Sequence, residues 1–114
     1  MASVRQNKAG RMILKELSLI FQKEARNLFK GAMISVTVVR MSPDLKVAKV
    51  YLSFFNVPDK DAMLEEVRGQ QGNVRRLLGN QVKNQVRNIP ELHFYLDDSI
   101  DYAEEIDTLL NKDK

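Results

Sequence analysis

The chain has 114 residues, of which 44% are hydrophobic and 29% charged, as is typical of one soluble globular domain. It contains no cysteine, which excludes disulfides and thiolate metal sites. The polar, basic N-terminus lacks an apolar signal-peptide core, and no stretch approaches the ~18 apolar residues of a membrane span. We therefore expect a cytoplasmic protein that makes no use of a membrane.

The net charge of +3 is unevenly distributed along the chain. Residues 1–31 carry seven basic and two acidic residues, and residues 68–89 carry five basic residues and no acidic one. Residues 90–114 carry two basic and eight acidic residues. Two basic blocks favour a polyanionic partner. Modestly basic small proteins are common, so charge alone leaves a solvated surface equally open.

The first half of the chain is predicted to form a helix and two strands. Apolar residues at helical spacing cover residues 12–28, and Gly31 is placed to end this helix. Residues 33–41 and 47–55 are rich in β-branched and alternating apolar residues, which favours strands. The turn signal Ser42-Pro43-Asp44 is short, so these strands should pair antiparallel.

The second half is predicted to contain two helices, a strand and a short terminal helix. Asp59 or Asp61 can cap a helix that runs through Val67, and glycines at 69 and 72 interrupt it. A longer helix from residue 73 to 88 stops before Pro90. Alternation over residues 92–96 predicts a third strand, and residues 100–110 fit a weak helix.

The resulting order, α-β-β-α-α-β, predicts an α+β fold in which helices cover one face of a three-stranded sheet. It is the element order of a type II K-homology (KH) domain. We expect a single KH-like domain over residues 1–110, with residues 111–114 frayed.

Gly69-Gln70-Gln71-Gly72 is a literal G-x-x-G, the form of the loop with which KH domains clamp single-stranded nucleic acid. Its neighbours argue against a clamp. Arg68 and Arg75 stand where such loops usually have aliphatic residues, and neither residue between the glycines is basic.

The long predicted helix has a buried stripe and a basic side. The stripe contains Val74, Leu77, Leu78, Val82 and Ile89. Arg76, Lys83 and Arg87 fall almost opposite, over roughly 16 Å of helix axis. No acidic residue is available to pair with them on this helix, so they suit a row of phosphates, although a solvated surface explains them too. Arg75, beside the core stripe, and Arg11, in the first basic block, are secondary candidates.

No catalytic or metal-binding set is recognisable. The single histidine, His93, lies on a predicted strand without an evident nucleophile and orienting acid. Asp97 and Asp98 are adjacent and would point to different sides, which suits a turn rather than acid–base chemistry. We therefore expect neither enzymatic activity nor a metal or cofactor.

Two segments, MSPDLKVAKVYLSFFN and VRRLLGNQVKNQVRNIPELHFYLDDSIDYAEEID, make the sequence resemble the ribosome-binding factor A family. The resemblance runs from about residue 8 to residue 110. It implies a type II KH-like fold in which an interrupted helix, usually Ala-x-Gly, replaces the clamp loop. Gln70-Gln71-Gly72 stands in that place, with Gln70 instead of the usual alanine. Gly72 is then the expected hinge of a helix kink.

The resemblance also implies a function in assembly of the small (30S) ribosomal subunit. Family members bind the free subunit and support late processing of precursor 16S ribosomal RNA near its 5′ end, above all in the cold, without cutting it. The implied partners are the subunit, its 16S RNA and ribosomal proteins, and we expect a monomer. Two other hypotheses remain: a helix-turn-helix DNA-binding protein using residues 61–68 and 73–88, and a protein-interaction module using the acidic residues 99–114.

Overall fold

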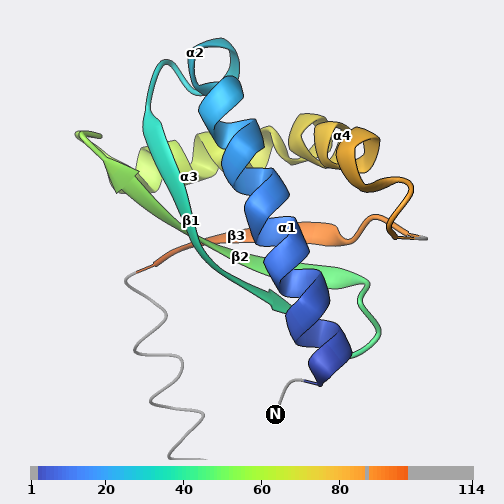
Figure 1. Cartoon of the computed structure of the whole chain (residues 1–114). Coiled ribbons are helices and arrows are strands. Elements are labelled where there is room, and N and C mark those ends of the chain that lie inside the picture. The colour runs from blue at the N-terminus through green and yellow to red at the C-terminus, as the bar shows by residue number, and fades with distance from the viewer. Residues whose placement is uncertain (1–2, 87, 98–114) are drawn as a thin grey trace, which may run out of the picture.

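The computed structural model describes residues 3–86 and 88–97. In this part of the chain the elements follow the predicted α+β order (Figure 1). They are α1 (Val4–Lys23), α2 (Ala25–Leu28), β1 (Met33–Met41), β2 (Val47–Phe55), α3 (Lys60–Gly69), α4 (Gln71–Val82) and β3 (Glu91–Leu96). The expected helix at residues 100–110 lies outside the described residues. None of the described helices has the length and apolar character needed to cross a membrane.

The three strands form one sheet in the order β1-β2-β3. β1 and β2 pair antiparallel, as their short connection predicts, and both strand bounds predicted from the sequence are confirmed. β2 and β3 pair parallel, which requires a long crossover that α3 and α4 supply. The element order therefore places α3 and α4 between the two parallel strands.

The core lies between one face of the sheet and the helices. Ala48, Val50, Leu52 and Phe54 alternate along β2 and are all buried. They join one cluster with the buried residues of the helices, namely Ile13, Leu17, Ile20 and Phe21 of α1 and Val74, Leu78 and Val82 of α4. Figure 1 shows α1 lying across the sheet, with α3 and α4 beside it. The helices thus form one layer over one face of the sheet, as predicted.

α1 begins eight residues before the predicted start. Ser3 caps it: the Gln6 N–H donates to Ser3 Oγ, and the Ser3 N–H donates to Gln6 Oε1. Gly10 lies against β1, where an added Cβ would be 3.0 Å from the Val39 carbonyl oxygen. Apolar spacing could not show this first part because Val4 and Ala9 are its only apolar side chains and they do not form a helical stripe. At the other end the backbone leaves helical geometry at Glu24, which separates α1 from α2.

α4 is shorter than predicted, and the predicted helix to residue 88 is wrong. It ends at Val82, whose carbonyl accepts from the N–H groups of both Gln85 and Val86. The chain then folds back, so that Ile89 packs against Gly79, where an added Cβ would lie 3.3 Å from Ile89 Cγ1. Ile89 therefore contacts the core cluster from the connection and not from the helical stripe.

Asp44 organises the turn between β1 and β2. Ser42 Oγ donates to Asp44 Oδ1 at 2.6 Å, and the Lys46 N–H donates to the same oxygen at 3.1 Å. These hydrogen bonds, that of Ser42 foremost, lower the pKa of Asp44 from its ordinary value of 3.8. Because the folded pKa is the lower one, the carboxylate stabilises the fold fully above the unfolded pKa. That contribution is lost as the pH falls through the folded pKa.

The variant Asp44→Asn should therefore change how stability depends on pH. We expect its free energy of unfolding to lie below that of the wild type at neutral pH, with the difference shrinking once the pH falls below 3.8. Urea unfolding followed by circular dichroism between neutral and acidic pH measures this difference. A difference that stays constant over the whole range would contradict the assignment.

Candidate nucleic-acid interface

The G-x-x-G tetrapeptide does not form a clamp loop. Gly69 is the last residue of α3 and Gly72 is the second residue of α4, so only Gln70 separates the two helices. The backbone break falls at Gln70, with φ −97° and ψ 10°, and Gly72 has no positive φ. The expected hinge at Gly72 is therefore corrected to Gln70. A single junction residue also differs from the turn of three to four residues in a helix-turn-helix.

Three side chains tie this junction to the outer edge of β3. Arg68 donates from Nε and Nη2 to the Phe94 carbonyl at 3.1 and 2.9 Å. Gln71 Oε1 accepts from the Leu92 N–H at 3.3 Å. Arg75 donates to the carbonyls of Ile89 and Pro90, which immediately precede β3, at 2.7 and 3.2 Å. The break at Gln70 thus sets α4 at a fixed position relative to the sheet.

Arg75 is one of the sequence-predicted RNA-contacting residues, and its guanidinium is already engaged within the fold. Its two acceptors are backbone carbonyls of the returning connection. Helical spacing gives no sign of them because they lie more than ten residues further along the chain. The structure therefore separates Arg75, which holds the connection, from its neighbour Arg76, whose exposed side chain has no ion pair within residues 3–86 and 88–97.

The predicted row of cations on α4 is shorter than expected. Arg76 is exposed on α4, and Lys83 follows as its C-cap in helical conformation, so the two remain on the same side of the helix, roughly 10 Å apart along the axis. Arg87 lies outside the described residues. Lys83, like Arg76, has no ion pair with the described part of the chain.

A second row of cations runs along α1. Lys8, Arg11 and Lys15 are all exposed, and their spacing places them on one stripe opposite the buried Ile13 and Leu17. They form no ion pair with other described residues. Only Arg11 of this row is among the candidates named from the sequence. The early start of α1 at Val4 is what brings Lys8 and Arg11 onto the same helix face as Lys15.

We call the five residues Lys8, Arg11, Lys15, Arg76 and Lys83 the basic surface. α1 and α4 pack against one another and bury their opposite sides on the sheet, so both rows point away from the sheet. Two of the three acidic residues of α3 are engaged elsewhere, since Glu65 pairs with Arg68 and Glu66 pairs with Lys30. An outward layer of cations on two helices is suited to contacts with a phosphate backbone.

Tyr51 and Tyr95, the tyrosines of the described residues, offer little for base stacking. Tyr51 is only 7% exposed, although it lies on the side of β2 that alternation predicts to be polar. Its ring packs against Tyr95 with centroids 5.6 Å apart, and the Arg68 guanidinium lies 5.8 Å from the centre of the Tyr95 ring. These contacts use the rings within the fold, so recognition would depend on backbone phosphates and shape.

The neighbouring residues Arg75 and Arg76 give a matched test of their two roles, which are support of the fold and contact with RNA. Arg75→Ala should lower stability by about 1 kcal/mol, because it removes two charge-assisted hydrogen bonds whose acceptors are partly open to water. Arg76→Ala should leave stability unchanged within roughly 0.5 kcal/mol, as for other exposed positions. In RNA-binding titrations at several salt concentrations, only Arg76→Ala should reduce the salt dependence, by somewhat under ~1 in slope. The reverse pattern would show that Arg75 leaves its carbonyls to contact RNA.

Comparisons with known proteins agree on one family. The family model for ribosome-binding factor A matches residues 5–110. Ribosome-binding factor A of Cytophaga hutchinsonii is 54% identical over 112 residues, covering 98% of this chain and 84% of the relative. That of Clostridium botulinum is 38% identical over 116 aligned positions, covering 100% and 98%.

Solved structures share the fold. The crystal structure of ribosome-binding factor A from Thermus thermophilus has a TM-score of 0.67 at 20% identity, over 80% of this chain and 94% of that one. A homology model of the Thermus thermophilus protein, fitted into a cryo-electron-microscopy map of its 30S complex, has a TM-score of 0.60 at 25% identity, over 75% and 88%. The observed element order is the type II KH-like arrangement.

Proposed function

The chain belongs to the ribosome-binding factor A family, and we propose that it binds the free small ribosomal subunit in the cytoplasm and supports late maturation of that subunit. A homology model of the Thermus thermophilus relative has been fitted into a map of its 30S complex, which supports the subunit as the partner. In this proposal the protein also supports processing of precursor 16S RNA near its 5′ end, chiefly in the cold, and does no cutting itself.

The observation that carries the proposal is the basic surface. Its cations lie on two helices of one layer and are not paired with acidic side chains of the described residues. Lysine and arginine side chains neutralise phosphates and release counterions, which gives affinity without reading sequence. Selectivity then comes from the shape of the ribosomal RNA and from the spacing of the two cation rows.

The fold keeps the two rows in a fixed relation. The side chains of Arg68, Gln71 and Arg75 hold the junction and the returning connection against β3, while α1 and α4 share one buried core. Cations that are already positioned lose less freedom on binding, which favours affinity. The interrupted helix thus acts as a rigid support for Arg76 and Lys83.

Co-sedimentation tests the partner. Purified protein is centrifuged with mature small subunits, precursor small subunits and whole ribosomes over a series of salt concentrations. We expect binding to both kinds of free small subunit that weakens steeply with salt. Folded protein that sediments with none of the three would contradict the proposal.

Depletion in cells tests the finer part of the proposal. Cells that lack the protein should accumulate 16S RNA with unprocessed 5′ ends, more strongly at low than at optimal growth temperature. Primer extension measures these ends, and a copy of the wild-type gene should restore normal 5′ processing. Incubation of the purified protein with precursor RNA should leave the RNA uncut. Normal 5′ ends in depleted cells, or cutting by the protein alone, would overturn it.

A further inference from the structure

The two outer edges of the sheet differ in a way that the proposed function does not explain. At the β3 edge, Arg68 and Gln71 occupy backbone groups of Phe94 and Leu92. At the β1 edge, within residues 3–86 and 88–97, only β2 is hydrogen-bonded to the backbone of Met33–Val36. An edge strand presents a row of free N–H and C=O groups that can pair with another strand. Among residues 3–86 and 88–97, side chains block one edge and leave the other open.

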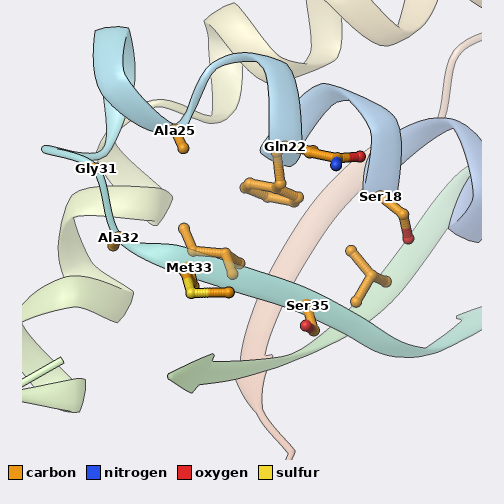
Figure 2. Close-up of a pocket in the computed structure, with 10 residues that line it drawn as sticks. Ser18, Gln22, Ala25, Gly31, Ala32, Met33 and Ser35 are labelled. Carbon is orange, nitrogen blue, oxygen red and sulfur yellow. The ribbon is translucent and has the colours of Figure 1, made fainter. Parts of the chain in front are cut away.

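A groove lies along the open edge, between β1 and the helices above it. Figure 2 shows Ser18, Gln22 and Ala25 on the helical side, while Met33 and Ser35 point away from the helices. Ile34 and Val36, which alternate with them along β1, line the strand side of the groove. Its volume is about 500 Å³. The buried ring of Phe21 forms part of its wall. A side chain of an added strand that pointed toward the helices would enter this groove.

The opposite face of the same edge carries exposed apolar side chains. Met33 and Phe55 are cross-strand neighbours at the end of the β1–β2 pair, and they are 63% and 68% exposed. Successive side chains of a strand point to opposite faces of the sheet. A strand added along Met33–Val36 would therefore place alternate side chains in the groove and against the Met33–Phe55 pair.

The charge next to the groove favours an acidic occupant. Arg11, Lys15, Ser18 and Gln22 follow one stripe of α1, and the last two line the groove. Gly10 touches Val39, and Gln6 Nε2 donates to the Met41 carbonyl, so the N-terminal half of α1 lies over the end of β1. Lys15 and Arg11 continue the stripe of Ser18 and Gln22, so they are the next cations along α1 in the direction that a strand leaving the groove toward the end of β1 would take.

A second copy of the chain fits this edge poorly. A second copy would pair its own β1, and Met33–Met41 contains no acidic residue, so this strand would leave Arg11 and Lys15 without an opposite charge. The shift in register between Val36 and Val38 further limits the regular edge to its first four residues, Met33–Val36. A short segment that is apolar at one end and acidic at the other matches the edge, the groove and the cations together.

We propose that the open edge of β1 binds an extended acidic segment of a partner protein, which adds to the sheet as a fourth strand with its apolar end in the groove at Met33–Val36. Backbone hydrogen bonds give affinity in this mode and alternate side-chain pockets give specificity. Phosphates would compete for Arg11 and Lys15 but would leave the edge of β1 unpaired. Binding at the edge is therefore distinguishable from RNA binding.

The test uses the whole chain and the fluorescent peptide Glu-Asp-Glu-Val-Ile-Val-Thr, with the same residues in reverse order as a second orientation. Binding is followed by fluorescence anisotropy, and amide hydrogen exchange locates it. We expect slower exchange in Met33–Val36 and no change in β3. Exchange protection elsewhere, or no binding of either peptide up to about 1 mM, would overturn the proposal.

Backbone methylation of the peptide identifies the binding mode without altering the protein. Methyl groups on the alternate nitrogens that face β1 should weaken binding about fivefold per lost hydrogen bond. Methyl groups on the other nitrogens should leave the Kd unchanged. Equal affinity of the two methylated peptides would rule out strand addition.

Two charge variants of the protein test where the acidic end of the peptide binds. Lys15→Glu should weaken binding of the acidic peptide and strengthen binding of a peptide with lysine in place of its three acids. Lys23→Glu is the matched control, because Lys23 is exposed on the same helix but lies off the stripe that Lys15 shares with Ser18 and Gln22. Equal effects of both variants, or slower exchange at Met33–Val36 with single-stranded RNA in place of peptide, would contradict the assignment.

Discussion

Replacing Arg11, Arg76 and Lys83 together with alanine is expected to weaken binding to free small subunits about a hundredfold at ~0.15 M salt. Counterion release makes each phosphate contact worth about fivefold in affinity at that salt, and the three effects should multiply. The three side chains are exposed and have no ion pair within residues 3–86 and 88–97, so the fold should remain intact. Unfolding curves of the variant check this directly.

The salt dependence separates a true interface from a general charge effect. The slope of log affinity against log salt should fall in magnitude by roughly 2–3 in the triple variant. The matched control replaces Lys23, Lys49 and Lys60, which are exposed and lie outside the basic surface. It removes the same net charge and should leave most of the slope. Equal losses in both variants would mean that net charge, and not the helix layer, determines binding.

β1 and β2 could be predicted from the sequence to the residue, because alternation and β-branched composition coincide in them, and β3 begins one residue before its predicted start. The helix ends could not. The start of α1 depends on a reciprocal cap between Ser3 and Gln6 in a polar segment that shows no apolar period. The end of α4 depends on Ile89 folding back onto Gly79, a contact that exists only once the chain is folded.

In the candidate site, too, some residues could be predicted from the sequence and others could not. Arg76 and Lys83 could be predicted to point outward because helical spacing alone sets their direction relative to Val74 and Leu78. Arg75 could not be assigned, because its acceptors are backbone carbonyls brought near by the returning connection. The position of the break was predicted at glycine because glycine tolerates unusual backbone angles. At Gln70 the angles are open to any residue, so glycine is not required there.

Phe21→Ala should produce the largest loss of stability, about 3–5 kcal/mol, because it leaves a cavity at the centre of the core. The side chain is fully buried. Its ring packs against Phe29, with centroids 5.2 Å apart, and against Phe94 at 6.1 Å in an edge-to-face arrangement. It thus joins α1 to the end of α2 and to β3, and neither neighbour can move into the space without leaving its own contacts.

Thermal unfolding followed by circular dichroism measures this loss, which corresponds to a fall of roughly 10–20 °C in Tm for a domain of this size. Phe21→Leu is the control and should cost less than about 1.5 kcal/mol, since it keeps most of the volume. Below its Tm, the alanine variant should keep the salt slope of the wild type, because the basic surface lies on the opposite side of α1. A reduced slope in the folded alanine variant would instead mean that the core around Phe21 positions the cations of α1 and α4 relative to one another.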